Sequence, residues 1–210
     1  MLINKKVNET KEKLGVFLGT FDPIHNGHMH IARSVILSIG LDSVIIVPSY
    51  ESPHKGESVC SSAKERMMMC NLACDGENLI LASDIEIKNK LKGYSLKKID
   101  LIAASNPQSK LYYIIGSDAY LTIMEWRNLE ELISKVAFCV VVRDKTDTNK
   151  VEKIKKELKL LGGETYICSF ATLDISSTSI RKIIRSNETI SGLLPQNVEK
   201  FILENKLYLY

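Results

Sequence analysis

The sequence predicts an α/β protein with a doubly wound, Rossmann-like parallel sheet. Short apolar, β-branched segments recur along the 210 residues, and helical patterns fill the intervals between them. Strands that alternate with helices favour a parallel sheet covered on both faces, and right-handed crossovers favour double winding. No internal repeat, low-complexity segment or Gly/Ser linker divides the chain. We therefore expect one domain over residues 14–210, with a core strand order of 3-2-1-4-5, preceded by an extension over residues 1–13.

Strands and helices are expected to alternate along the chain, because the spacing of the apolar residues changes from one segment to the next. Runs of apolar and β-branched residues predict strands at 16–18, 44–47, 79–81, 112–115, 136–142 and 166–168. Apolar residues at helical spacing predict helices at 29–39, 63–74, 96–104, 129–134 and 151–161, and two more helices close the chain after Ser176.

Composition excludes several classes of function. The net charge of +3 is too small to indicate nucleic-acid binding, and the lysines of residues 150–159 have the spacing of a solvated helix face. No apolar run reaches the roughly 20 residues that span a bilayer, and residues 1–13 lack a signal-peptide core. We therefore expect a cytoplasmic protein with no membrane or nucleic-acid partner. The sequence leaves open whether it forms a homo-oligomer.

The five cysteines are expected to be free thiols, because their number is odd and no signal peptide precedes them. Cys70 and Cys74 can share one face of a helix, but no second Cys or His pair with metal-ligand spacing accompanies them. Cys139 and Cys168 stand in apolar strands and are expected in the core.

Two histidines stand at the corner between the first expected strand and the helix after it. His25 and His28 belong to the run Gly19-Thr20-Phe21-Asp22-Pro23-Ile24-His25-Asn26-Gly27-His28. In an open α/β sheet, ligands bind beyond the carboxyl ends of the strands, and a helix start favours phosphate. Two imidazoles there can donate hydrogen bonds to a phosphate whose charge is changing. A lone histidine near a turn is more often structural, which is our interpretation of His30.

The fourth expected strand also ends in polar residues, Gly116-Ser117-Asp118. In the order 3-2-1-4-5, strands 1 and 4 flank the point where ligands bind. The two polar strand ends are therefore expected to meet at one cleft. Asp118 either accepts hydrogen bonds from a ribose or caps the helix that follows, and the sequence leaves both roles open.

A polyphosphate site is expected near the C-terminus, because the chain has neither a Walker A motif nor a GxGxxG after its first strand. The segment Ile175-Ser176-Ser177-Thr178-Ser179-Ile180-Arg181 places four hydroxyls and an arginine at the start of a helix, which suits phosphate. The alternative is an ordinary Ser/Thr cap with a surface arginine.

Together these segments resemble the nucleotidyltransferase α/β-phosphodiesterase superfamily and, within it, the bacterial nicotinate-nucleotide adenylyltransferase family. Residues 19–28 and 175–181 are similar to segments that the whole superfamily shares, so they indicate the chemistry rather than the substrate. More specific likenesses are VPSYESPHK, GYSLKKID, YYIIGSDAYLTIMEWRNLEEL and LLPQNVEKFILENKLY. The resemblance covers residues 14–208. It departs at Leu18, where the family usually has glycine, at the single Pro53, and at Gly93-Tyr94-Ser95, where the order of hydroxyls differs.

The resemblance implies adenylyl transfer from ATP to nicotinate mononucleotide, which gives nicotinate adenine dinucleotide and pyrophosphate in NAD biosynthesis. It implies catalytic roles for His25, His28 and Thr20. The implied ATP-binding residues are Gly19, Thr20, His25, His28, Gly116, Asp118, Ser177, Thr178 and Arg181. The implied acceptor-binding residues are Asp22, Lys55, Tyr94, Ser95 and Trp126. Mg²⁺ is expected to arrive on the ATP phosphates, because no carboxylate cluster forms an obvious protein cage.

Several alternatives stay open. Trp126 either stacks on the pyridine ring or belongs to the core, and Asp22 orients either the mononucleotide or the turn. The protein can be another adenylyl- or cytidylyltransferase of the superfamily, with phosphopantetheine or nicotinamide mononucleotide as acceptor. It can also be a non-catalytic nucleotide sensor. Residues 94–95 at a helix start favour the nicotinate carboxylate over a neutral amide.

Overall fold

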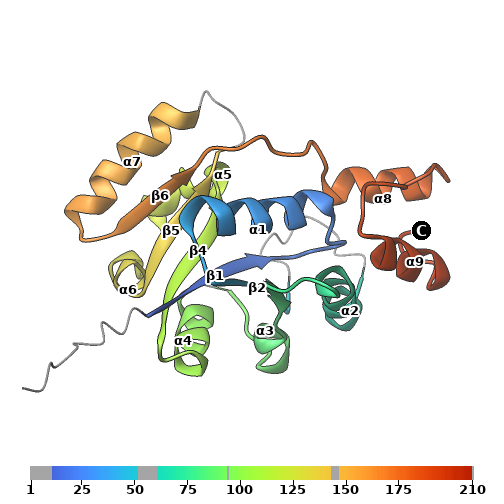
Figure 1. Cartoon of the computed structure of the whole chain (residues 1–210), viewed down its shortest axis with the longest axis horizontal. Coiled ribbons are helices and arrows are strands. Elements are labelled where there is room, and N and C mark those ends of the chain that lie inside the picture. The colour runs from blue at the N-terminus through green and yellow to red at the C-terminus, as the bar shows by residue number, and fades with distance from the viewer. Residues whose placement is uncertain (1–10, 52–60, 94, 143–146, 210) are drawn as a thin grey trace, which may run out of the picture.

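The computed structural model describes residues 11–51, 61–93, 95–142 and 147–209. Its parallel strands form one sheet in the order β3-β2-β1-β4-β5-β6 (Figure 1). The strands are β1 (Glu12–Gly19), β2 (Ser43–Pro48), β3 (Ile80–Ala82), β4 (Ser109–Gly116), β5 (Val136–Val141) and β6 (Glu164–Cys168). The predicted fold class and strand order are confirmed. Strand β1 takes in the last two residues of the expected extension.

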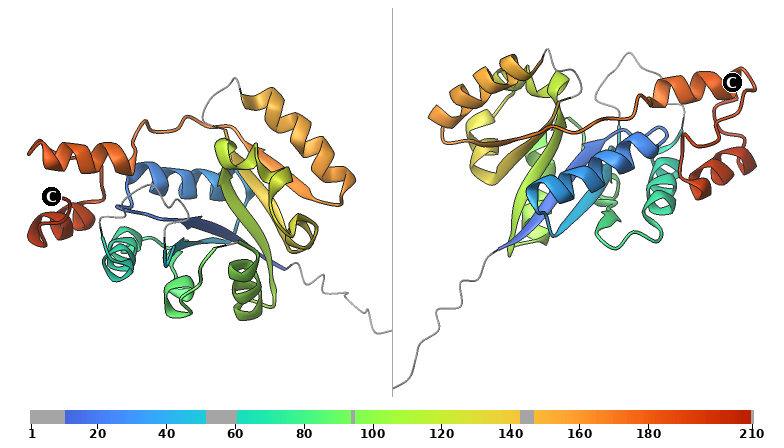
Figure 2. Two further views of the ribbon diagram at one scale, coloured as in Figure 1. Left: turned by 180° about the vertical axis from the view of Figure 1, so that it is seen from behind. Right: turned by 45° about the horizontal axis from the view of Figure 1, so that its top comes forward.

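Helices cover both faces of the sheet (Figure 2). The longer ones are α1 (Asn26–Ile39), α2 (Ala63–Cys74), α4 (Ser95–Ser105), α6 (Leu129–Lys135), α7 (Thr148–Leu160), α8 (Ser177–Arg185) and α9 (Gln196–Glu204). The short ones are α3 (Ile85–Lys88), α5 (Ser117–Tyr120) and the 3₁₀ turn η1 (Ile123–Glu125). Sequence periodicity did not reveal these three, because three or four residues are too few to display a helical repeat.

The core consists of two apolar clusters, one on each face of the sheet. Buried residues of α1, α2, α8 and α9 belong to one cluster, and those of α4, α6 and α7 to the other. Neighbouring residues of a strand point to opposite faces, so Tyr112 and Tyr113 of β4 fall in different clusters. Every residue of β5 is buried, as expected of a strand covered on both faces. Cys139 and Cys168 are both in the core.

The predicted helix boundaries differ from the observed ones mainly at the N-termini. Helix α1 begins at Asn26 rather than at residue 29, and α7 begins at Thr148 rather than at residue 151. Polar residues fill these first turns, so they carry no apolar signal. Helix α2 has the predicted bounds, and the two helices predicted after Ser176 are present.

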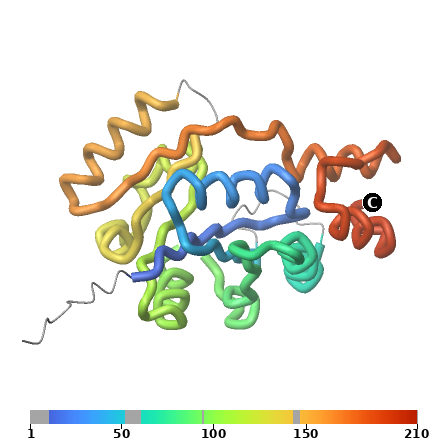
Figure 3. Tube along the Cα trace, viewed as in Figure 1, coloured from blue at the N-terminus to red at the C-terminus, as the bar shows by residue number. Residues whose placement is uncertain are grey.

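The chain between β6 and α8 crosses over α1 and brings the C-terminal helices beside the carboxyl end of β1 (Figure 3). His30 holds this crossing segment, since its Nε2 lies 2.7 Å from the carbonyl oxygen of Ala171 and its ring meets Phe170 edge-on. The structural interpretation of His30 is therefore confirmed. Within the described ranges, none of the helices is long and apolar enough to cross a membrane.

Candidate active site

The turn after β1 is built around the ring of Phe21. A Cβ atom at Gly19 would lie 2.8 Å from this ring, so only glycine leaves room for it. Phe21 has a φ of 52°, in the left-handed region that few side chains adopt. Its ring packs edge-on against Phe17 and His28, with centroid separations of 5.5 and 4.9 Å. The Phe21 ring thus links the end of β1 to His28 by direct contact.

His25 and His28 lie against each other at the start of α1. Their rings are stacked, with centroids 3.7 Å apart. The backbone N–H of His25 donates to Nδ1 of His28 at 3.3 Å, which leaves Nε2 as the protonated nitrogen of a neutral His28 ring. His25 is buried, and a Cβ at Gly27 would lie 2.9 Å from its Nδ1. Glycine at position 27 is what allows this ring to lie against the helix.

The start of α8 is bonded to the same turn. The Ser177 hydroxyl donates to the carbonyl oxygen of Pro23 at 2.8 Å, and Arg181 Nη1 donates to the carbonyl oxygen of Asp22 at 2.8 Å. Residues more than 150 positions apart in sequence therefore meet at the two histidines. A cavity of about 330 Å³ lies between them, lined by His25, Gly27, Ile31 and residues 172–176.

The capping interpretation of the Ser/Thr segment is confirmed, and its phosphate-binding interpretation stays a prediction. Ser176 caps α8, since its hydroxyl accepts from the backbone N–H of Ser179 at 3.0 Å and the Ser179 side chain bonds back. Thr178 is exposed, and its hydroxyl oxygen lies 3.4 Å from Nη2 of Arg181. Two hydroxyls thus stabilise the helix start, while Thr178 and Arg181 lie at the surface beside it.

Asp22 is buried, with 3% of its surface exposed. Its carboxylate accepts hydrogen bonds from the hydroxyl of Ser61 and, at 2.7 Å, from the hydroxyl of Tyr208. Burial, together with the neighbouring Asp22 carboxylate, raises the pKa of Tyr208. These contacts favour the second of its two predicted roles, in which Asp22 holds the turn and the C-terminal segment together.

Arg66 ties the same turn to the end of β2. It is almost completely buried, and it donates to the carbonyl oxygens of Thr20 at 2.8 Å and Tyr50 at 3.2 Å. Glu86, also buried, accepts from the backbone N–H of Tyr50 at 3.0 Å and pairs with Lys98 at 2.9 Å. Burial lowers the pKa of Arg66 and raises that of Glu86. This charged network was missed from the sequence, because nothing in the local pattern of α2 marks Arg66 as buried.

The end of β4 adjoins the end of β1, because the two strands are neighbours in the sheet. The Asp118 carboxylate is exposed and folds back over Gly116, in the space that a Cβ would need there. The preceding Ser117 is buried and donates to Asp147 at 3.1 Å. Asp118 is therefore an exposed carboxylate at the switch point, and glycine at position 116 permits its orientation.

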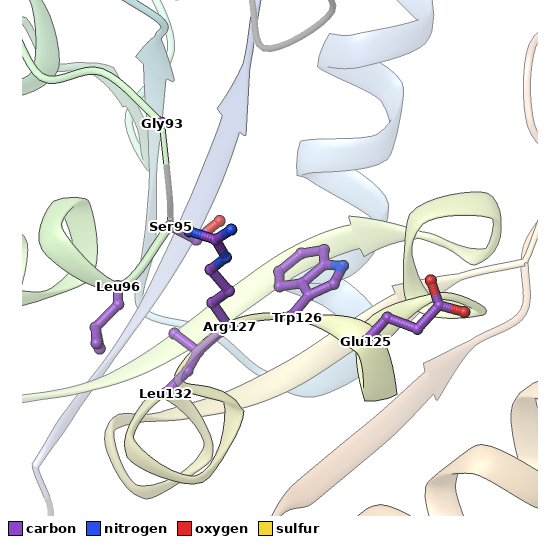
Figure 4. Close-up of a pocket in the computed structure, with 7 residues that line it drawn as sticks. All are labelled: Gly93, Ser95, Leu96, Glu125, Trp126, Arg127 and Leu132. Atoms are coloured by element: carbon purple, nitrogen blue, oxygen red, sulfur yellow. The ribbon is translucent and has the colours of Figure 1, made fainter.

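A second, larger cavity of about 540 Å³ lies on the α4–α6 side of the sheet (Figure 4). Its lining residues are Gly93, Ser95, Leu96, Glu125, Trp126, Arg127 and Leu132. Ser95 lies 3.2 Å, hydroxyl to hydroxyl, from the buried Tyr113, whose pKa burial raises. Trp126 packs partly on Tyr113 and the core and partly lines the cavity, so its core contacts are present and its stacking on the pyridine ring stays a prediction.

The structure thus brings Ser95 and Trp126 together, as the acceptor assignment requires. Lys55 and Tyr94, the other two residues of that assignment, lie outside the described ranges. Sequence reasoning missed Arg127, although it follows Trp126 directly. An arginine beside an aromatic residue expected to bind an anionic ligand was the available signal.

Comparison with known proteins agrees with this geometry. Residues 16–183 match the Cytidylyltransferase-like family, so the chain belongs to this class of nucleotidyltransferases. It is 34% identical to "Probable nicotinate-nucleotide adenylyltransferase" of Desulfatibacillum aliphaticivorans, over 94% of this chain and 100% of that protein. The protein of the same name from Clostridium novyi (strain NT) is also 34% identical, over 95% and 99%. The chain therefore belongs to the nicotinate-nucleotide adenylyltransferase family, and the resemblance seen in the sequence is confirmed.

The fold has a close counterpart among solved structures. Nicotinic acid mononucleotide adenylyltransferase of Plasmodium falciparum, complexed with NaAD, aligns with a TM-score of 0.72 over 94% of this chain and 97% of that one. The two sequences are 18% identical, so this likeness concerns the fold.

Proposed function

We propose that this protein transfers the adenylyl group of ATP to nicotinate mononucleotide, giving nicotinate adenine dinucleotide and pyrophosphate. The observation that carries the proposal is the meeting of the stacked His25–His28 pair with the start of α8 at the β1–β4 switch point. Helix starts, imidazoles and a guanidinium together suit a chain of phosphates whose charge is redistributed during reaction. Family membership gives independent support.

The reaction requires little covalent participation by the protein. An oxygen of the mononucleotide phosphate attacks the α-phosphorus of ATP in line. The bond from that phosphorus to the oxygen bridging to the β-phosphorus breaks, and pyrophosphate leaves with the electron pair. The attacking phosphate is already ionised, so no strong general base is needed. Positioning and stabilisation of the spread negative charge supply the catalysis.

The residues of the turn and of α8 are assigned to the phosphates of ATP. Nε2–H of His28 and the His25 ring would donate to the α- and β-phosphates, with Gly19 and Thr20 holding the α-phosphate. Ser177, Thr178 and Arg181 would hold the β- and γ-phosphates, and Gly116 and Asp118 would lie at the ATP ribose. ATP would enter as its Mg²⁺ complex. Over the described ranges, no three His, Cys, Asp or Glu side chains converge as a metal site.

The larger cavity is assigned to the mononucleotide. Trp126 offers a face for stacking the pyridine ring, and Ser95 offers a hydroxyl at the start of α4. Lys55 and Tyr94 remain assigned to the acceptor on sequence grounds alone.

Release of pyrophosphate tests the proposal directly. Purified protein with ATP and Mg²⁺ is incubated with nicotinate mononucleotide, nicotinamide mononucleotide, phosphopantetheine or no acceptor, and the nucleotide product is identified by chromatography. We expect pyrophosphate and the dinucleotide in equal amounts, with a higher kcat/KM for nicotinate than for nicotinamide mononucleotide. A ratio near or below one would remove the nicotinate assignment. ATP binding with no release for any acceptor would instead indicate a sensor.

A further inference from the structure

We propose that the buried ion pair between Glu86 and Lys98 is a positioning device. By holding the start of α4 against the end of β2, it determines where the acceptor lies relative to the phosphates of ATP. Both residues are assigned to positioning rather than to contact with a substrate. The inference rests on the proposed function, because it takes the cavity at Ser95 as the site of the mononucleotide.

The pair joins three elements at one carboxylate oxygen. Glu86 of α3 is 0% exposed, and Lys98 of α4 is 7% exposed. Lys98 Nζ lies 2.9 Å from Oε1 of Glu86, and the same oxygen accepts from the backbone N–H of Tyr50 at 3.0 Å. Tyr50 stands just after the carboxyl end of β2. A single oxygen therefore fixes α3, α4 and the end of β2 to one another.

From Tyr50 the hydrogen bonds continue to the turn that is assigned to ATP. The Tyr50 carbonyl oxygen accepts from Nη2 of Arg66 at 3.2 Å, and Nη1 of Arg66 donates to the carbonyl oxygen of Thr20 at 2.8 Å. In Figure 1, α3 lies between α4 and α2, the helix that carries Arg66. An unbroken run of polar contacts therefore leads from Thr20 to Lys98.

The far end of this run lies at the larger cavity. Lys98 stands three residues after Ser95, so the two side chains share one face of α4. Ser95 is the first residue of the helix and lines the cavity. A shift or rotation of α4 would move the Ser95 hydroxyl with it. The ion pair thus sets the distance between a hydroxyl assigned to the mononucleotide and the turn at Thr20.

The energetics of the pair favour positioning over stabilisation. Removing two charges from water costs free energy, and a buried ion pair is often no more stabilising than apolar residues of similar volume. Oε2 of Glu86 is buried without a hydrogen-bond partner within the described ranges, which adds to that cost. Helix α4 also buries Leu96, Ile99 and Ile102, whose packing already holds it on the core. Apolar contact is not directional, whereas hydrogen bonds have a preferred distance and angle, so the pair contributes orientation.

The test removes both charges and keeps the shape of the pair. In the double variant Glu86→Gln/Lys98→Met, an amide oxygen can still accept from the Tyr50 N–H, and an unbranched side chain still fills the space of Lys98. We expect the urea midpoint of unfolding to stay equal or rise, because no buried charge loses its partner in the pair. We expect kcat/KM for nicotinate mononucleotide to fall about tenfold, because a small displacement of one reactant lowers the rate, while the KM for ATP stays within about twofold.

The matched control is Asp100→Asn/Lys135→Met. This pair also holds α4, since it joins Asp100 to Lys135 of α6, but the two side chains are 42% and 32% exposed. An exposed pair contributes little, so the control should keep the stability and the kcat/KM of the wild type. If Glu86→Gln/Lys98→Met does not fold, Glu86→Gln alone turns the ionic contact into a neutral hydrogen bond. It should still lower kcat/KM for the mononucleotide and leave the KM for ATP unchanged.

Three results would overturn the inference. Unchanged kinetics in the folded double variant would leave the buried pair with no role in positioning. Equal changes for ATP and for the mononucleotide would indicate a general loosening of the site. An equally large fall in kcat/KM in the control would remove the distinction between the buried and the exposed pair. Failure of the wild type to form the dinucleotide would instead overturn the proposed function, and it is measured before any variant is compared.

Discussion

The two halves of the candidate site are built in different ways. The turn at His25 and His28 is held by hydrogen bonds from distant parts of the chain, including Tyr208 to Asp22 and Ser177 to Pro23. The cavity at Trp126 is lined by two short segments, around Ser95 and around Arg127, and several of its side chains are exposed. We call the first the phosphate frame and the second the acceptor cavity.

The difference indicates where the protein needs precision. In-line transfer depends on fixed positions of charge-stabilising groups, and a displacement of about 1 Å can cost much of the rate. Partly buried hydrogen bonds from Arg66 and Arg181 to backbone carbonyls hold the phosphate frame in place. Choice of acceptor needs only a difference in affinity between similar ligands, which partly exposed side chains such as Trp126 and Ser95 can supply.

The largest effect on stability is expected from removing Arg66. In Arg66→Ala, the buried Asp22 and Glu86 carboxylates lose a neighbouring positive charge, and two carbonyls lose their donor. We expect a loss of about 3–5 kcal/mol in the free energy of unfolding, measured by urea denaturation. Arg33→Ala breaks an exposed pair with Glu77 and should cost under about 1 kcal/mol. Similar losses in both variants would contradict the view that the phosphate frame depends on buried charge.

Removing His28 should affect the rate and leave the fold intact. Loss of one preorganised donor to a transition-state charge typically lowers kcat by roughly 10²–10³. His30→Ala is the matched control on the same helix, because His30 bonds to Ala171 and has no assigned role in the chemistry. Steady-state kinetics and thermal melting of both variants check this. Full activity in a folded His28→Ala protein would remove His28 from the mechanism.

The sequence predicted the parts of the molecule that local patterns encode. The strand positions, the paired histidines and the capped Ser/Thr segment follow from short-range signals such as apolar runs and helix-start residues. The strand order follows from the succession of strands and helices along the whole chain together with the right-handed crossover rule. The bonds between these parts could not be read in the same way, because Tyr208 and Asp22 are 186 positions apart. Arg66 lies on a helix with three other polar or charged residues, and only the folded chain shows which one is buried.

Arg181→Ala should raise the KM for ATP by about 10–100-fold, since a hydrogen bond to a charged group contributes about 1.5–3 kcal/mol. The KM for the mononucleotide should change much less, because Arg181 lies in the phosphate frame. Arg181→Lys should recover only part of the loss. Initial rates with each substrate varied in turn provide the measurement, and equal increases in both KM values would count against the assignment.

The smallest effects come from two buried tyrosine hydroxyls, one in each region. Tyr208 donates to the Asp22 carboxylate in the phosphate frame, and Tyr113 bonds to the Ser95 hydroxyl beside the acceptor cavity. At pH 8 we expect Tyr208→Phe to cost about 1.5 kcal/mol, because its partner is charged, and Tyr113→Phe about 0.5–1 kcal/mol. Tyr113→Phe alone should also raise the KM of the mononucleotide, by about twofold, because it releases Ser95.

The two tyrosines also make the stability of the protein depend on pH. Burial raises the pKa of both, so each stays neutral in the folded protein while it ionises near pH 10 in the unfolded chain. The unfolded state then binds fewer protons, and the stability of the wild type falls as the pH rises past about 10. Each Phe variant lacks one of these ionising groups, so its stability should fall less steeply, and the cost of the substitution should shrink between pH 8 and pH 11. Urea denaturation of the wild type and of the two Phe variants between pH 8 and pH 11 measures how the free energy of unfolding of each depends on pH. If Tyr208→Phe and Tyr113→Phe lowered the free energy of unfolding equally at pH 8, the hydrogen bond in the phosphate frame would be no stronger than the one beside the acceptor cavity.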